Sequence, residues 1–364
     1  MQGRKVQAPR FWARASPVSM IAYSQSIMNL IESDYLETPE GLFFAVKGIA
    51  QPPDRVLAYL RYAPDPQGER LCRGRPYRRL YHFAEQEQLL RARYAQYLAY
   101  DTVTRLDLQS VPRSSIARAY SARQGLQAIR QHSRRDPVEE DAFLFASRLQ
   151  KISGIPWSSL GISGSLLIGL HTPASDLDMT VHGEQDCWTL HLALSALLEE
   201  DSGDIRRLDE AGLRALYAER SADTEMTYGD FIHSERQKVI QGRFRERMYF
   251  IRFLQKPSEF GEIYGDRQYT PCGRATIEAR VMDHRKAIFT PCSYKISEAR
   301  TIAGEAVPEI SEIVSFRGRF CEQARAGEVV RASGAIERVA HSSGQVWHRL
   351  VLGSEFADTM NVRR

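Results

Sequence analysis

Cysteine is scarce in this chain of 364 residues, and none of its five cysteines forms a C-x-x-C pair. Structural zinc sites usually rest on such pairs, so a zinc site of this kind is not expected. An odd number of cysteines at scattered positions is typical of reduced, mostly buried thiols. The sequence therefore points away from both a disulfide framework and a zinc fold.

Long hydrophobic runs are also missing. No stretch reaches the roughly 18 apolar residues of a membrane-spanning helix, so no membrane partner is expected. The basic N-terminal residues lack the apolar core and the cleavage site of a secretory signal, which favours a cytoplasmic protein. Repeats and low-complexity segments are absent as well. With 43% hydrophobic residues, the chain is expected to form two or three globular domains.

Charge is present in both signs but unevenly spread. Residues 70–135 hold fourteen arginines and four acids, a balance of +10, and residues 136–220 hold six basic and fifteen acidic residues, a balance of −9. The basic block favours RNA or DNA as a partner and the acidic block favours a divalent metal, although solvated helical surfaces explain both blocks too. The densest basic cluster is expected around a loop over 64–76. Its candidate nucleic-acid-binding residues are Arg70, Arg73, Arg75, Arg78 and Arg79.

The periodicity of apolar residues predicts an α+β fold in four parts. In the second part, strands are expected at 42–48 and 56–62, and helices at 84–98 and 114–132. The four parts are an N-terminal arm (1–35), a basic α/β region (36–135), a core of mixed sheet flanked by helices (136–266) and a β-rich, barrel-like domain (267–364).

The most informative stretch covers residues 161–181. Gly164 has no Cβ, so the backbone there can approach a ligand closely. Ser165 opens a short helix, where free N–H groups and a hydroxyl can bind phosphate. Asp176 and Asp178 lie two apart on a predicted strand, which places both carboxylates on one face. Such a pair repels unless a cation lies between the carboxylates, and Mg²⁺, which prefers oxygen ligands, is the natural occupant.

This arrangement resembles the nucleotidyltransferase superfamily that includes DNA polymerase beta, the CCA-adding enzymes and the minimal nucleotidyltransferases. The resemblance implies that Gly164 and Ser165 hold the triphosphate of an NTP, and that Asp176 and Asp178 bind two catalytic Mg²⁺ ions. It also implies transfer of a nucleoside monophosphate to an acceptor, with release of pyrophosphate. The residues that match the family pattern are Gly164, Ser165, Asp176, Leu177, Asp178 and Met179.

More closely, the order of sequence blocks resembles an archaeal group of predicted nucleotidyltransferases of unknown substrate. That resemblance includes the segments Ile-Phe-Thr-Pro-Cys at 288–292 and Phe-Arg-Gly-Arg-Phe-Cys at 316–321, and it covers residues 34–352. The acceptor is not implied by it. RNA ends, DNA ends, a protein side chain and a small molecule all stay open.

Two departures from the family pattern leave an alternative open. Ile168 stands where many members have arginine, and Arg252 stands at the centre of the strand that should carry a third carboxylate, the general base. Glu278, on the next predicted strand, is the candidate for the missing catalytic carboxylate, with a surface glutamate as the other interpretation. The alternative function is a catalytically degenerate nucleotidyltransferase scaffold that binds nucleic acid.

Three further residues are candidates for binding the nucleotide. His171 follows the short helix and could contact phosphate, or it could cap a helix. Arg243 and Arg245 precede the strand that contains Arg252, and they could bind the triphosphate or form a solvated basic turn.

Overall fold

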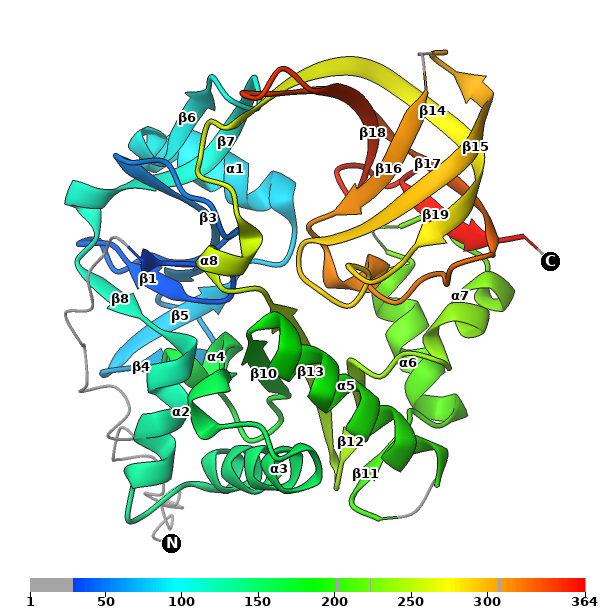
Figure 1. Cartoon of the computed structure of the whole chain (residues 1–364). Coiled ribbons are helices and arrows are strands. Elements are labelled where there is room, and N and C mark those ends of the chain that lie inside the picture. Colours follow the sequence, from blue (N-terminus) through cyan, green and yellow to red (C-terminus); the bar gives the residue numbers. More distant parts are fainter. Residues whose placement is uncertain (1–28, 201–202, 223, 307–308, 364) are drawn as a thin grey trace, which may run out of the picture.

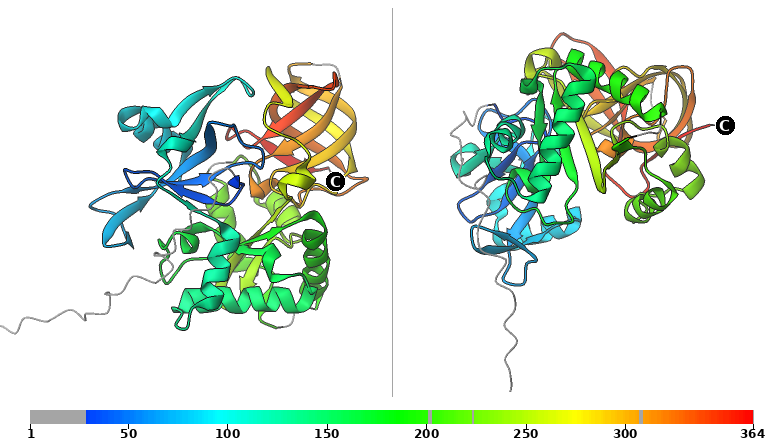
Figure 2. Two further views of the ribbon diagram at one scale, coloured as in Figure 1. Left: turned by 60° about the vertical axis from the view of Figure 1, so that its left-hand side comes forward. Right: turned by 90° about the horizontal axis from the view of Figure 1, so that it is seen from below.

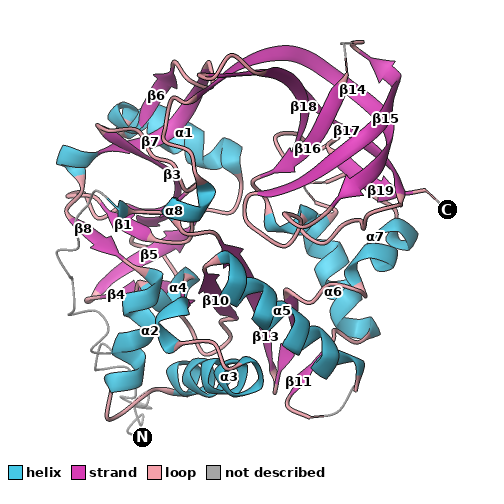
Figure 3. Ribbon diagram, viewed as in Figure 1, coloured by secondary structure: helices cyan, strands magenta, loops and turns pink. Residues whose placement is uncertain are grey.

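The structure is a computed structural model that describes residues 29–200, 203–222, 224–306 and 309–363. Three β-sheets and the helices around them form an α+β chain (Figure 1, Figure 3), which confirms the predicted fold class at that level. Most of the expected N-terminal arm, residues 1–28, lies outside the described residues. Within the described part, no helix is both long and apolar enough to cross a membrane.

The N-terminal sheet has eight strands in the order β4-β5-β3-β2-β1-β8, with β7 paired to β3 and β6 paired to β7. Buried and half-buried residues alternate along most of β3, as expected for a strand with one face in a core. Helix α1 (Phe83–Arg93) follows β5 in the chain. The strands are β1 (Tyr35–Glu37), β2 (Phe43–Val46), β3 (Arg55–Pro64), β4 (Arg70–Cys72), β5 (Arg75–Arg79), β6 (Leu98–Asp101), β7 (Leu106–Pro112) and β8 (Arg118–Tyr120).

Two predictions in this part are wrong in detail. The expected loop over 64–76 contains β4 and the start of β5, and their hairpin turns at Arg73 and Gly74, with φ of 49° and 78°. Positive φ at both residues defines the tight two-residue hairpin turn, whose usual Asn-Gly or Asp-Gly signal is missing here. The stretch 114–132, expected to be one helix, begins with the end of a short 3-10 turn (Arg113–Ser115) and strand β8, and only its second half is an α-helix, α2 (Ala122–Gln131).

The central sheet has five strands in the order β11-β12-β13-β10-β9, and β10 and β13 run parallel. Helices α3 (Pro137–Ser153) and α5 (Glu184–Glu199) pack on one face; Phe145 of α3 contacts Tyr249 of β13, with ring centroids 4.8 Å apart. By the alternation along strands, Asp178 and Arg252 lie on the other face. The strands are β9 (Leu160–Ile162), β10 (Leu177–His182), β11 (Ile205–Arg206), β12 (Gln241–Phe244) and β13 (Arg247–Leu254).

The C-terminal sheet curls into a barrel, as predicted for this β-rich part. Strands β14, β15, β16, β18 and β17 pair in a closed circuit, because β17 also pairs with β14. The parallel pair β16–β18 among antiparallel neighbours suits a five-stranded Greek-key barrel. The strands are β14 (Arg267–Asp283), β15 (Cys292–Gly304), β16 (Ile310–Ser315), β17 (Val329–His341), β18 (Val346–Leu352) and β19 (Thr359–Val362), which pairs with β17.

The N-terminal sheet and the barrel lie side by side, on the side of the central sheet away from α3 (Figure 1, Figure 2). The barrel contacts the central sheet through its loops. Phe253 of β13 forms an isolated bridge with Phe289, and Gly318 lies so close to Phe250 that an added Cβ would be 2.5 Å from the ring. Both loop residues belong to the segments 288–292 and 316–321, so these segments hold the barrel against the central sheet.

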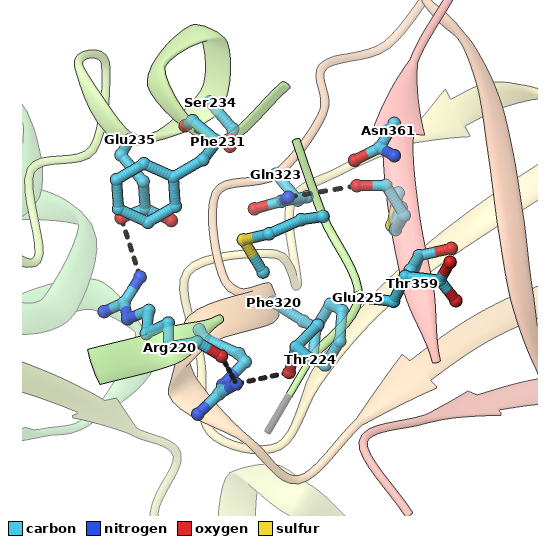
Figure 4. A pocket seen from close by; sticks show the side chains of 13 residues that line it. Arg220, Thr224, Glu225, Phe231, Ser234, Glu235, Phe320, Gln323, Thr359 and Asn361 are labelled. Carbon is cyan, nitrogen blue, oxygen red and sulfur yellow. Dashed lines mark hydrogen bonds and ion pairs between the residues drawn. The ribbon is translucent and has the colours of Figure 1, made fainter. Parts of the chain in front are cut away.

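Helices α6 (Glu210–Arg220) and α7 (Tyr228–Glu235) lie between the central sheet and the barrel in the chain. Helix α8 (Pro257–Phe260) belongs to the connection that leads into β14. Figure 4 shows a small pocket between the α6–α7 region and β19. At this pocket Arg220 forms an ion pair of 2.8 Å with Glu235, and Arg319 donates to Thr224. Its volume of about 20 Å³ suits about one water molecule. The pocket is too small for a substrate, and the residues that line it connect the α6–α7 region to the barrel.

Candidate functional site

The glycine-serine turn packs directly against the second aspartate of the motif. Gly164 begins α4 (Gly164–Leu167) with φ of +62°, and a Cβ added to it would lie 2.0 Å from Oδ2 of Asp178. The backbone N–H of Ser163 donates to the carbonyl oxygen of Asp178 at 2.7 Å. The structure therefore brings together the two halves of the predicted motif, and only glycine fits at position 164 because any side chain would displace the carboxylate.

The loop that leads into Asp176 is held in place by Ser165 and Arg247. The Ser165 hydroxyl donates to Oγ of Ser175 at 3.3 Å, and that oxygen also accepts the N–H of Thr172 at 2.9 Å. From the opposite side, Nη1 of Arg247 donates to the carbonyl of Ser175 at 3.1 Å. These bonds place Asp176 at the entrance to β10, next to Ser165, so the predicted residues Gly164, Ser165, Asp176 and Asp178 lie together in the structure.

Asp176 carries a charge that the protein compensates poorly. Its side chain reaches solvent, yet surrounding protein atoms displace enough water to raise the pKa of its carboxyl group, and the neighbouring Asp178 raises that pKa further. Arg79 acts in the opposite direction but does not outweigh these two causes. A bound cation would relieve this repulsion, which is the expected property of a metal-binding carboxylate pair.

Replacing Asp176 with asparagine is expected to stabilise the fold. A carboxyl whose pKa is raised by folding costs stability above that pKa, where the folded protein must hold the charge, and costs nothing at low pH, where both states are protonated. Because the side chain is exposed and solvent screens its charge, we expect the melting temperature at pH 7 to rise only slightly, by about 1 °C or less, and the gain to shrink as the pH falls. Thermal unfolding followed by circular dichroism measures it, with the exposed Asp107→Asn as control. A lower melting temperature for Asp176→Asn than for the wild type at pH 7 would contradict this interpretation.

Arg252 lies beside Asp178. Its Nη1 atom is 3.4 Å from Oδ1 of Asp178, and its guanidinium lies 5.0 Å from the ring centroid of Phe250. The described residues contain no group of three or more His, Cys, Asp or Glu side chains that could hold a metal. Two carboxylates still suit Mg²⁺, which is commonly held by one or two carboxylates together with substrate phosphates. The site thus fits a metal that a further ligand also coordinates better than a metal bound by protein alone.

Glu278 is not brought to this site. It lies on β14 in the barrel, where it forms ion pairs with Arg300 at 3.3 Å and Arg363 at 3.5 Å. The prediction of a catalytic Glu278 rested on strand order alone, but β14 joins a different sheet from β10 and β13. It is therefore a barrel residue held by ion pairs.

The other three predicted nucleotide-binding residues have partners within the protein, and Nη1 of Arg243 donates to the carbonyl of Glu246 at 3.4 Å. Nε2 of His171 is 2.7 Å from Oδ2 of Asp136, the residue that caps α3, so His171 is tied to a helix start. Arg245, in the turn after β12, forms an ion pair of 3.3 Å with Asp141. Arg243 of β12 pairs with Met248 of β13. Met248 lies two residues before Phe250, the partner of Asp178, so Arg243 lies on the face of the sheet that carries Asp178.

The predicted nucleic-acid-binding arginines lie on the β4–β5 hairpin rather than in a loop. Arg70 is buried and donates to the carbonyl of Leu170 at 2.8 Å, just after α4. Arg73 forms an ion pair with Glu37 at 2.9 Å. Arg75 donates to a backbone carbonyl at 3.0 Å, and Arg78 forms an ion pair of 3.1 Å with a neighbouring aspartate. Four of the five arginines thus bond to other parts of this chain. Arg79 differs from them, because its buried Nε atom has no hydrogen-bond partner.

Residues of the N-terminal sheet that the sequence analysis did not single out also face the site. Arg61 and Tyr59 of β3 lie within electrostatic range of Asp178 and Arg252, respectively. Lys47, which follows β2, lies 5.3 Å from the ring centroid of Tyr59 and forms an ion pair of 2.9 Å with Glu32. No local pattern marks these residues, because they reach the site only through the docking of two sheets.

Comparison with known proteins adds a relative without a described activity. No family model matches the chain, and no solved structure matches it. Over 329 residues the chain is 29% identical to an uncharacterized protein of the archaeon Methanocaldococcus jannaschii. That alignment covers 88% of this chain and 94% of the relative. The chain is therefore similar to an archaeal protein along most of its length.

Proposed function

We propose that this chain is a metal-dependent nucleotidyltransferase that moves a nucleoside monophosphate from an NTP to an acceptor. The observation that carries this proposal is the contact between Gly164 and the Asp178 carboxylate, with Asp176 at the entrance of the same strand. A phosphate-binding turn beside two carboxylates on one face provides what phosphoryl transfer requires, namely positioning and charge compensation.

In this reaction an acceptor oxygen attacks the α-phosphorus of the NTP. The bond from that phosphorus to the bridging oxygen of the β-phosphate breaks, and pyrophosphate leaves with the electron pair. Asp176 and Asp178 would hold Mg²⁺, which supplies positive charge to the phosphate oxygens when bound. The backbone at Gly164 and Ser165 would contact the phosphates. Arg252 would remain beside Asp178 and add a second positive charge at the reacting centre.

Arg252 stands at the position where a third carboxylate is expected, so the proton of the acceptor must leave by another route. If the nucleophile is a hydroxyl group, its proton passes to water or to a phosphate oxygen. If the nucleophile is a phosphate or a carboxylate, its oxygen is already ionised at neutral pH and no base is needed. The guanidinium of Arg252, partly buried beside Asp178, therefore favours an anionic acceptor.

Transfer of label tests the proposal directly. We expect the purified protein, incubated with each of the four α-labelled NTPs and Mg²⁺, to label one of three fractions: total RNA, total DNA or total protein. Addition of EDTA should remove the label, and incubation without any fraction controls for self-labelling. If no fraction and no small molecule acquires label with any NTP, and no pyrophosphate is released, nucleotidyl transfer is not the function.

A second candidate is a nucleotidyltransferase scaffold that binds nucleic acid without catalysis. The ion pair between Arg252 and Asp178 favours it, because the guanidinium neutralises one of the two carboxylates that a metal would need. In that case the chain should bind neither Mg²⁺ nor NTP at this site. Binding to RNA or DNA should then weaken with salt and stay unchanged when Asp176 is replaced.

A further inference from the structure

A β-bulge in the N-terminal sheet directs Arg61 toward the carboxylate pair. Between β2 and β3, Phe43 pairs with Tyr62 and the next residue, Phe44, pairs with Leu60, so Arg61 is the extra residue of the bulge. Bulges turn a side chain out of the regular alternation and are frequent beside functional sites. Phe43 and Tyr62 belong to the hydrophobic core that continues into the central unit. Tyr59, two residues before Arg61, packs against the same core, so Arg61 shares with Tyr59 and Tyr62 the face of the sheet that is turned toward the central sheet.

Arg61 and Arg79 have no acceptor among the described residues, unlike the neighbouring arginines of the hairpin. The guanidinium of Arg61 lies 5.9 Å from the ring centroid of Tyr59 and 5.9 Å from that of Tyr81. Arg79 lies 4.5 Å from the ring centroid of Tyr81, and its Nε atom is buried without a hydrogen-bond partner. A guanidinium offers five donors, and a buried donor without an acceptor is costly. Both side chains are therefore suited to an external anion.

The strands that carry the two arginines are held beside the turn that follows α4. Tyr62, the neighbour of Arg61, pairs with Arg79 across β3 and β5. The β4–β5 hairpin bonds to this turn through Arg70, which donates to the carbonyl of Leu170 at 2.8 Å. No ion pair joins either arginine to either aspartate in the described structure, so the charges lie near one another without direct contact. A group that is anionic toward the arginines and carries a cation toward the aspartates would satisfy both pairs, and a metal-bound polyphosphate is such a group.

We propose that Arg61 and Arg79 bind the triphosphate of the NTP, so that the N-terminal sheet supplies the second wall of the nucleotide site opposite Gly164 and Ser165. This inference rests on the proposed function. It assigns to β3 and β5 the phosphate-binding role that the sequence analysis gave to Arg243 and Arg245. Planar guanidinium groups suit it, because they donate two parallel hydrogen bonds to phosphate oxygens.

Calorimetric titration with inorganic tripolyphosphate and Mg²⁺ tests the assignment without knowledge of the preferred base. We expect Arg61→Met and Arg79→Met each to weaken binding by about tenfold or more, since charge-assisted bonds to phosphate are strong. Arg61→Lys and Arg79→Lys, which keep the charge, should lose less. Arg91→Met is the matched control, because Arg91 is exposed on α1 and its ion pair with Glu87 is long, at 3.8 Å. Melting temperatures identify any variant that fails to fold.

The outcomes separate this inference from the proposed function. If both methionine variants bind tripolyphosphate as the wild type does, while Asp178→Asn loses binding, the arginine assignment is wrong and the nucleotide site stands. If the variants keep tripolyphosphate affinity but lose transfer, the arginines serve the acceptor, and the triphosphate assignment is again overturned. If the wild type binds no tripolyphosphate with Mg²⁺, both the inference and the proposed function fail.

Discussion

Replacing Asp178 with asparagine is expected to reduce nucleotidyl transfer by at least about a thousandfold, because the charge that would hold the metal and compensate the phosphates is lost. Asparagine retains the shape that packs on Gly164 and an oxygen that can still accept from Arg252. We therefore expect the melting temperature to stay within a few degrees of the wild type. Release of labelled pyrophosphate measures the rate, and thermal unfolding checks the fold.

The matched control for this experiment is Glu278→Gln. Glu278 has the same charge and lies in an ion-paired setting on β14, but the structure places it in another sheet. The control should keep wild-type activity. A chain in which Asp178→Asn retains full activity, or in which Glu278→Gln abolishes it, would show that the reacting centre lies elsewhere.

Replacing Gly164 with alanine is expected to abolish activity and to destabilise the protein. The residue has a φ of +62°, where an L side chain is strained by about 1–2 kcal/mol. In addition, the new Cβ would lie 2.0 Å from Oδ2 of Asp178, so the carboxylate or the turn must move. Misplacement by about 1 Å at a reacting centre can reduce a rate about a hundredfold. Transfer assays and urea unfolding measure the two effects.

Gly154 provides the control for the backbone strain. It ends α3 with φ of +72°, and a Cβ added there would have no atom within 4 Å. Gly154→Ala therefore carries the strain of a positive φ without a collision, and it should lower stability modestly while leaving activity intact. If Gly164→Ala behaves like Gly154→Ala in both assays, the contact between the turn and Asp178 is not essential to the function.

The parts of the site that are close in the chain could be predicted from local patterns. Gly164 and Asp178 lie fourteen positions apart, and a turn, a short helix and a strand between them leave few arrangements. The strand pattern also identified β13 and the cation at its centre, Arg252. The barrel could be anticipated because alternating apolar residues continue through most of the last hundred residues.

The parts of the site that depend on long-range contacts could not be predicted. The five arginines of the hairpin look alike in sequence, and their difference comes from distant partners such as Glu37 for Arg73 and Leu170 for Arg70. The role of Arg61 depends on a bulge, which is a property of the register between β2 and β3 and has no local signature. Glu278 was assigned by strand order, which cannot show that β14 pairs in a different sheet.

The most direct test of the central claim is calorimetric titration of the wild type and of Asp178→Asn with each of the four NTPs, with and without Mg²⁺. Metal and nucleotide should bind together, because two carboxylates hold Mg²⁺ firmly only when substrate phosphates complete its coordination. The account predicts that at least one NTP binds the wild type only when Mg²⁺ is present, and that the substitution removes this binding. Absence of binding for all four NTPs with Mg²⁺, or binding that is unchanged by EDTA and by Asp178→Asn, would contradict it.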